Sequence, residues 1–284
     1  SQLEPLLADA LGTLAFSTNF DMPSLDPNGA PVSVALETDF GAVSVKGSGA
    51  EFQLRASASA PDSNSYDNLG AVARSGCGVS EQVMELPKSG PFEIGFSDDT
   101  FNLLLYAAWQ GGLLEFEVPP EMLADVDLSQ YGIGSDALTI HMSGMLAPVV
   151  TDCGGEGLVL HVGDLKVTAN LEIFGQSMDV EMYASFSAGV SLSVADGVLG
   201  IEIEEVQDLD SQIAILQEEL VGSEAGIAAL IDDNLVPALL GALGGGALGG
   251  FPLPEITLTD EMLNLPPGSI PAGTAIGIEP NSSS

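Results

Sequence analysis

Apolar residues recur every three or four positions along a segment from about residue 211 to residue 243. This spacing places them on one side of an α-helix, which at 1.5 Å per residue would be roughly 50 Å long. Such a helix needs a long sheet or a cavity to cover its apolar side. Pro237 predicts a bend or a fresh start, with Asp233 or Asn234 as N-cap. The apolar positions are Ile213, Leu216, Leu220, Ile227, Leu230, Ile231, Leu235, Val236, Leu239, Leu240 and Leu243.

Between residues 157 and 206, apolar and polar residues alternate, which is typical of strands with one apolar face. The sequences Phe174-Gly175-Gln176 and Ala195-Asp196-Gly197 resemble hairpin turns and divide this region into three long antiparallel strands. The apolar positions are Leu165, Val167, Ala169, Leu171, Ile173, Met178, Val180, Met182, Ala184, Phe186, Ala188, Val190, Leu192, Val194, Leu199, Ile201 and Ile203.

Residues 100–111 predict a second, shorter helix, which Asp98 or Asp99 can cap and which a pair of glycines ends. Residues 113–118 then alternate as a strand, and two prolines end that strand. The buried face of the short helix would consist of Phe101, Leu104, Leu105, Ala108 and Trp109.

The N-terminal part of the chain predicts a helix end followed by short strands. Within residues 1–25, an apolar stripe at helical spacing ends near residue 16; it consists of Leu3, Leu6, Leu7, Ala10, Leu11 and Leu14. Asp26-Pro27-Asn28-Gly29 is typical of a type I turn. We expect short strands over 32–36, 42–46 and 52–58, and mostly loop over 59–91.

Together these patterns predict an α+β fold. A strongly curved antiparallel sheet wraps around one short and one very long helix, and the helix 211–243 lies along the concave face of the strands 158–206. A sheet that wraps two helices can leave an elongated apolar groove between them.

The charge of the chain excludes one large class of function. The sequence has 41 acidic and only 5 basic residues, a formal net charge of −36, so the protein repels nucleic acids and anionic membrane surfaces. Two interpretations of the acidity remain. We favour a role in solubility at high salt over calcium binding, because no twelve-residue calcium-loop pattern is present.

The cysteines and the lengths of the apolar runs indicate in which compartment the protein is located. No run of 18 or more apolar residues predicts a membrane-spanning helix. The two cysteines, Cys77 and Cys153, suit a disulfide and therefore an oxidising compartment, which makes the protein secreted, periplasmic or exposed at the cell surface. Two unrelated buried thiols are the alternative. Because the sequence begins with Ser1 and no signal peptide, we expect a processed chain or a fragment.

The sequence contains no pattern that indicates catalysis, a metal or a cofactor, so we expect a protein that is not an enzyme. His141 and His161 occur in strand-like sequence without the partners that acid–base chemistry needs. The stretch 132–137 matches a dinucleotide fingerprint in letters only and is expected to be a loop. Paired carboxylates at 98/99, 208/210 and 232/233 coincide with predicted helix starts, where capping explains them.

Three segments carry a resemblance to a known family. The segment 97–114, the strands 158–206 and the sequence from Leu235-Val236-Pro237 to Phe251-Pro252-Leu253-Pro254 resemble the C-terminal barrel of the tubular lipid-binding superfamily, which includes the bactericidal/permeability-increasing, lipopolysaccharide-binding and cholesteryl-ester-transfer proteins. The resemblance implies that residues 1–90 hold the end of a preceding barrel helix and central-sheet strands, that residues 91–278 form the C-terminal lipid-binding barrel, and that residues 279–284 are a disordered tail.

The resemblance implies a lipid-binding or lipid-transfer protein that holds a phospholipid or fatty acid without catalysis and without stable membrane insertion. Lipopolysaccharide binding through clustered Lys and Arg is not expected in so acidic a chain. The alternative is a structural or surface-interaction protein with a solid barrel, whose acidic face binds calcium or a partner protein. In the lipid-binding case the groove would be lined by Phe101, Leu104, Leu105, Ala108, Met178, Met182, Phe186, Leu230, Leu235, Leu239, Leu240 and Leu243.

Overall fold

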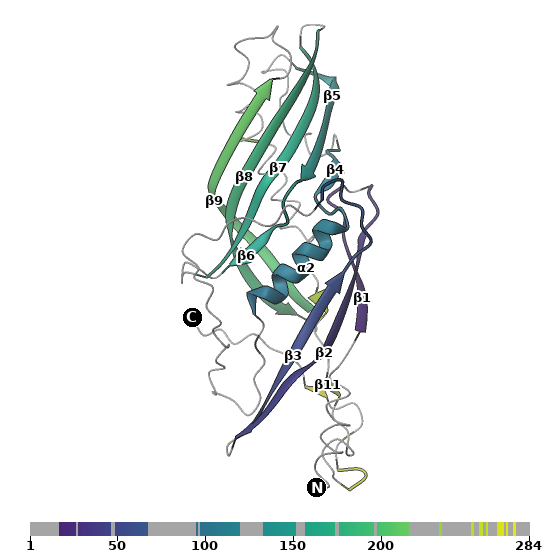
Figure 1. Ribbon diagram of the computed structural model, residues 1–284. Helices are drawn as coiled ribbons and strands as arrows, with labels where there is room; N and C mark the ends of the chain where they lie inside the picture. The colour runs from purple at the N-terminus through teal and green to yellow at the C-terminus, as the bar shows by residue number, and fades with distance from the viewer. Residues whose placement is uncertain are drawn as a thin grey trace.

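The protein is mostly antiparallel sheet, with a curled half-barrel and one helix in the part of the chain that is described (Figure 1). The structure is a computed structural model. It describes residues 17–26, 28–46, 49–67, 95, 97–119, 133–151, 157–173, 176–195, 198–215, 233–234, 251–252, 256–257, 260, 266–269, 271 and 275–276.

The strands form one small sheet, one large sheet and one short pair. The small sheet has the order β1-β2-β3, from β1 (Ser17–Met22), β2 (Val32–Lys46) and β3 (Gly49–Ser59). The short pair joins β11 (Ile256–Thr257) to β12 (Ala275–Ile276). The large sheet has the order β10-β9-β8-β7-β5-β4, with β6 paired to β7; its strands are β4 (Glu115–Glu117), β5 (Ile133–Gly144), β6 (Val149–Thr151), β7 (Leu158–Ile173), β8 (Gln176–Ala195), β9 (Val198–Ile215) and β10 (Phe251–Pro252).

The three long strands predicted from the alternation are confirmed as β7, β8 and β9. They are consecutive antiparallel neighbours, and their ends meet at the two predicted hairpin sequences, where Ile173 pairs with Gln176 and Ala195 with Val198. Their apolar side chains share the inner face of the half-barrel, where Val167, Val180 and Met182 are buried, while Asn170 and Asp179 on the other face are exposed.

The predicted start of the long helix is wrong. Residues 211–215 belong to β9, which pairs with β8 as far as Ile215 opposite Val180. The carboxylates at 208 and 210 therefore lie in a strand and not at a helix start. The rest of the predicted helix lies outside the described residues, apart from Asp233 and Asn234, whose backbone is helical of the π type. The described residues thus contain one helix, and the fold is mostly sheet.

Two irregularities in the β8–β9 ladder explain why the predicted strand ended too early. The register shifts between Ser187 and Ala188 and again between Ala188 and Val190, so β9 carries an extra residue at each point. As a result, the β9 residues opposite the inward positions of β8 are Ile203, Val206, Leu209, Ser211, Ile213 and Ile215. The three-residue steps from Ile203 to Leu209 interrupt the period-2 pattern, so the sequence did not show that the strand continues to Ile215.

The short helix is confirmed as α2 (Asp98–Gln110), with Gly111 as its C-cap. The predicted N-cap is wrong: Ser97 occupies that position, without a side-chain capping hydrogen bond, and Asp98 and Asp99 lie in the first turn. Carboxylates there still interact favourably with the helix dipole. The buried face is as predicted, since Phe101, Leu104, Leu105, Ala108 and Trp109 are all buried.

Other predicted boundaries need correction. The strands expected at 32–36 and 42–46 are one strand, β2, with a bulge between Phe40 and Ala42. The stretch at 132–137, expected to be a loop, lies in β5 from Ile133 onward, where the register with β7 is irregular up to Leu138. The strand expected at 113–118 is confirmed in its central part as β4.

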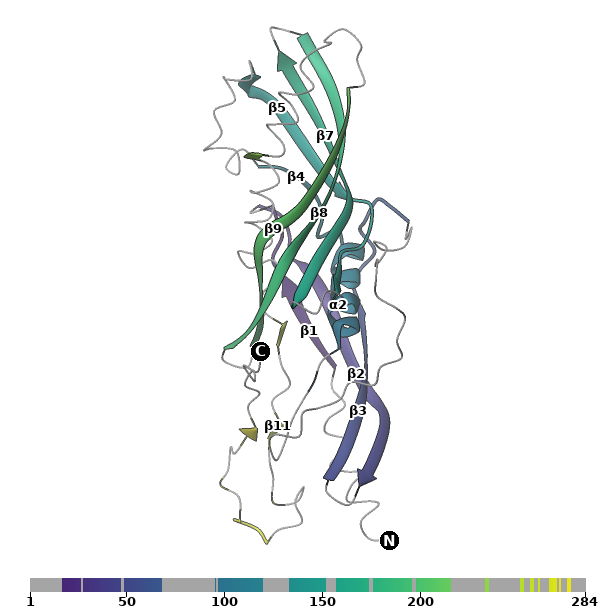
Figure 2. The ribbon, with the colours of Figure 1, turned by 90° about the vertical axis from the view of Figure 1, so that its left-hand side faces the viewer.

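Helix α2 lies between the two sheets and contacts β2 and β3 on one side and β6 on the other (Figures 1 and 2). One continuous core includes Val34 of β2, Leu104 of α2 and Leu160 of β7. Asn102 fixes the helix to β6: its side chain donates to the Val150 carbonyl at 3.0 Å and accepts from the Val150 N–H at 2.7 Å. The helix is thus the joint between the sheets.

Irregular positions bend the large sheet at the level of this joint. On β7, Gly163 and Asp164 stand opposite a single residue of β8, and Asp164 has a left-handed backbone with φ 47°. The neighbouring strands β5 and β6 both pair with β7 but are separated by residues 145–148. Bulges increase local twist, so this level is where the sheet curls into a half-barrel.

Several predictions lie outside the described residues: the helical stripe before residue 16, the Cys77–Cys153 disulfide and the tail at 279–284. The division of the chain at residue 90 stays a prediction. Among the described residues, no helix has the length and apolar character needed to span a bilayer.

Candidate functional site: the apolar interior beside α2

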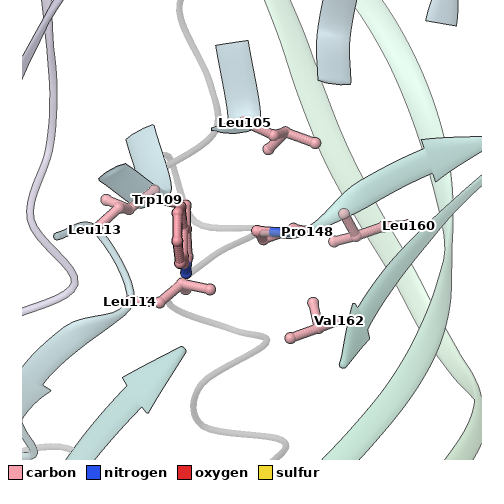
Figure 3. Close-up of a pocket in the computed structure, with 7 residues that line it drawn as sticks. All are labelled: Leu105, Trp109, Leu113, Leu114, Pro148, Leu160 and Val162. Atoms are coloured by element: carbon pink, nitrogen blue, oxygen red, sulfur yellow. The ribbon is translucent and has the colours of Figure 1, made fainter. Parts of the chain in front are cut away.

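An apolar interior site lies where the C-terminal half of α2 faces the large sheet (Figure 3). Leu105 and Trp109 project from α2, and Leu113 and Leu114 follow directly after it in the chain. Across the site stand Pro148, which precedes β6, and Leu160 and Val162 of β7. All of these side chains are buried and apolar, so the site can hold apolar matter only.

The free space in this site is very small. A water-sized sphere can reach only about 10 Å³ between these side chains, which is at the lower limit for one water molecule. An acyl chain does not fit there. Next to α2, the sequence pattern that predicted a groove has produced a packed core.

Polar groups close this core at one end. The indole Nε1 of Trp109 donates to the Gly144 carbonyl at 2.7 Å in a buried position. The Gly144 N–H donates to the Leu114 carbonyl at 2.9 Å. A Cβ at residue 144 would lie 2.8 Å from Cβ of Leu114, so the close approach of these two segments requires glycine. Asn64 adds a bond from Nδ2 to the Trp109 carbonyl at 3.0 Å.

The structure brings together six of the residues predicted to line a lipid groove. Phe101, Leu104, Leu105 and Ala108 on α2 and Met182 and Phe186 on β8 all belong to the one continuous core. Met178 lies in β8, in a part of that strand where the backbone alone is described. The other five predicted residues, Leu230, Leu235, Leu239, Leu240 and Leu243, lie outside the described residues.

Sequence reasoning missed several residues of this core. Leu160 and Val162 precede the bulge at Gly163 and Asp164, which puts them out of phase with the predicted inward positions from Leu165 onward, so a strict period of two would not have identified them. Asn102 and Gly144 carried no usable signal, because their roles depend on β6 and on Leu114, which are distant in sequence. Pro148 could not have been placed either, since it lines the site from a break between two strands.

The outer face of the half-barrel carries a polar cluster formed by Lys166, Glu181 and Tyr183. Lys166 Nζ lies 2.7 Å from Glu181 Oε2, and the Tyr183 hydroxyl donates to Glu181 Oε1 at 2.5 Å. The hydrogen bond to Lys166, and then that to Tyr183, lower the pKa of Glu181, while the hydrogen bond to Glu181 raises the pKa of Lys166. Each member has a partner within the cluster, which therefore ties β7 to β8.

The remaining candidate groups do not assemble into a catalytic or metal site among the described residues. His141 lies in β5 and is exposed, and His161 in β7 lies 3.2 Å by Nε2 from Thr151 Oγ1. Within the same residues no three His, Cys, Asp or Glu side chains are grouped to hold a metal ion.

A second, polar hollow of about 290 Å³ lies between the turn at 24–31, the end of α2 and β4. It is lined by Asp26 and Glu115, among others. Both carboxylates already accept hydrogen bonds, from the N–H of Asn28 and from Ser65 respectively.

Comparison with known proteins adds no identity. No family model matches the chain, and no curated protein matches it in sequence.

The packed core predicts a large effect of truncating Leu160, which is 1% exposed. Leu160→Ala should lower the free energy of unfolding by about 2–5 kcal/mol, because surrounding side chains collapse only partly into the cavity. Leu192→Ala is the matched control, since Leu192 is 37% exposed in β8 and should cost less than about 1 kcal/mol. Urea denaturation measures both. If Leu160→Ala lowers the free energy of unfolding by less than about 1 kcal/mol, the core around Leu160 is loosely packed.

The polar cluster predicts a specific pH dependence. Because the pKa of Glu181 is lowered below its ordinary value of 4.5, the stability it contributes is complete above that value and is lost as the pH falls through the lowered pKa. The difference in unfolding free energy between the wild type and Glu181→Gln should therefore be constant from about pH 6 to 8 and shrink below about pH 4.5. Glu202→Gln, at an exposed position, controls for the general charge. A difference that does not change on acidification would refute this role of Glu181.

Proposed function

We propose that the protein binds lipid, a phospholipid or fatty acid, and holds its acyl chains against the inner face of the half-barrel without catalysis. The observation that carries the proposal is the length of that apolar face. On β7, β8 and β5 the inward residues remain apolar well beyond the part next to α2, through Leu165, Val167 and Ala169, Ala184, Met182 and Val180, and Met142 and Ile140.

The packing beside α2 restricts where lipid would bind. Helix α2 lies against the end of the sheet formed by β6 and the start of β7, and about 10 Å³ is free there. The acyl chains would therefore lie beyond the bulge of β7, along Val167, Ala169, Val180 and Met182. Of the residues predicted from the sequence, this location favours Met178 and Met182 over Phe186, which pairs with Val162 on the α2 side of the bulge, and over the four on α2.

The other wall of the groove would be the amphipathic segment after β9. Its sequence carries an apolar stripe that includes Leu230, Leu235, Leu239, Leu240 and Leu243. A lipid groove needs two apolar walls. The inner face of the half-barrel and the apolar side of this segment would supply them. The resemblance to tubular lipid-binding proteins rests on the same segments.

Binding of this kind needs no charged contact. Each buried CH₂ contributes about 0.8 kcal/mol, so ten methylenes contribute on the order of 8 kcal/mol before the costs of ordering are subtracted. Met and Phe side chains suit a flexible ligand, because Met in particular adapts its shape. This agrees with a chain that has only 5 basic residues.

The second candidate function is a structural or surface-interaction protein with a solid barrel. The packed core beside α2 favours it, because the same packing could continue through the whole half-barrel. Its acidic surface would then meet a partner protein or calcium. In either case we propose an oxidising compartment, secreted, periplasmic or at the cell surface, on the strength of Cys77 and Cys153.

Lipid content and uptake separate the two candidates. Organic extraction of the purified protein followed by mass spectrometry should yield phospholipid or fatty acid, and a fluorescent fatty acid should bind saturably. Ala169→Trp, on the inner face, should reduce uptake at least about tenfold by filling the groove. Thr168→Trp, one residue away on the outer face, should leave uptake unchanged.

Circular dichroism and urea denaturation would establish that both variants fold. Should Ala169→Trp fail to fold, the wild type alone decides: an extract without lipid, together with no saturable uptake, would rule out lipid binding and leave the solid-barrel function. Ala108→Trp is unsuitable for this test, because Ala108 is 0% exposed in the packed core and a larger side chain would disrupt the fold.

A further inference from the structure

The far half of the β2–β3 hairpin is a two-stranded ribbon that extends away from α2 (Figures 1 and 2). Strand β1 pairs with β2 only from Val32 to Glu37. Beyond Glu37, β2 and β3 continue as a pair to Lys46 and Gly49. A two-stranded ribbon is marginally stable in water unless something covers one of its faces.

One face of this ribbon is apolar at every position except Thr38, which pairs with Ala56. On β3 every second residue shares a face, and along this face Ala58 packs against the core, Ala56 is half-buried and Leu54 is 44% exposed. The cover provided by α2 therefore ends near Leu54. By register, the residue pairs that continue this face toward the turn are Phe40 with Leu54, Val43 with Phe52, and Val45 with Ala50.

The opposite face is polar and exposed. It carries the ion pair between Arg55 Nη2 and Asp39 Oδ2, at 3.5 Å, with both side chains more than 70% exposed. Gln53, Ser57 and Glu37 lie on the same side and are exposed. The ribbon is thus amphipathic, which is the pattern of a sheet whose apolar face is covered.

We propose that residues 1–16 of the same chain cover this apolar face. The direction of the chain carries the argument: β1 is antiparallel to β2, and its first residue, Ser17, stands opposite Glu37. The residues before Ser17 therefore leave β1 on the side of the hairpin turn, at the level where the ribbon loses its cover.

Sequence and length fit this role. The segment has an apolar stripe at helical spacing, and Asp9 falls on the side away from it; the stripe consists of Leu3, Leu6, Leu7, Ala10, Leu11 and Leu14. As a helix, twelve residues span about 18 Å, and the ribbon beyond Glu37 extends about 30 Å, so the segment covers most of it. A second copy of the chain offers the same surfaces, but the tethered segment acts at an effective concentration in the millimolar range.

Hydrogen exchange on the full chain tests the proposal. Leu7→Asp places a charge in the stripe and should raise the exchange rate of backbone amides in residues 40–56 by about tenfold or more. Ala8→Asp, one residue away and off the stripe, should leave those rates unchanged. In the reciprocal pair, Leu54→Asp should raise exchange in residues 1–16, while Gln53→Asp, on the polar face, should not.

Three results would overturn the proposal. Equal effects of Leu7→Asp and Ala8→Asp would show that the stripe does not cover the ribbon. If the protection of residues 40–56 rises with protein concentration and does not respond to Leu7→Asp, a second copy of the chain covers the face. If the protection disappears when bound lipid is extracted and does not respond to Leu7→Asp, lipid covers the face. None of these readouts depends on whether the half-barrel binds lipid.

Discussion

Burial of one short helix against two sheets at once holds this protein together. Helix α2 contacts β2 and β3 on one side and β6 of the large sheet on the other. Its buried apolar side chains belong to one continuous core that includes residues of both sheets. Buried side chains of this size each contribute roughly 1.5–3 kcal/mol. Gly111 is part of the same constraint, since a Cβ there would lie 2.3 Å from Cγ1 of Val32 and push the helix end off β2.

This joint lies at one end of an apolar interior that continues along the half-barrel. Next to α2, close packing, the Trp109–Gly144 hydrogen bond and the Asn102 clamp leave no room for a ligand. Beyond the bulge of β7, the inner face of the half-barrel carries the same apolar residue types, and Leu165, Val167 and Met182 there are likewise buried. The same types of apolar side chain pack the core next to α2, and our proposed lipid site would use them beyond the bulge.

Much of the fold could be predicted because β7 and β8 alternate regularly and α2 has clear ends. The long helix predicted at 211–243 illustrates the limit: the two register shifts interrupt the alternation of β9 before residue 209, and only the pairing with β8 reveals that residues 211–215 continue the strand. The candidate site was predictable in composition but not in volume. A sequence shows that Leu105 and Phe186 are apolar, whereas the space between them depends on Pro148, Leu160 and Val162, which approach from other segments.

The claim that α2 joins the two sheets into one core can be tested directly, because Trp109 is the only tryptophan of the chain and lies in that joint. Equilibrium unfolding in urea should be followed by tryptophan fluorescence and by far-ultraviolet circular dichroism, which reports on all strands. The account predicts coincident transitions with one midpoint. A fluorescence transition at clearly lower urea, with most of the sheet signal retained, would contradict it.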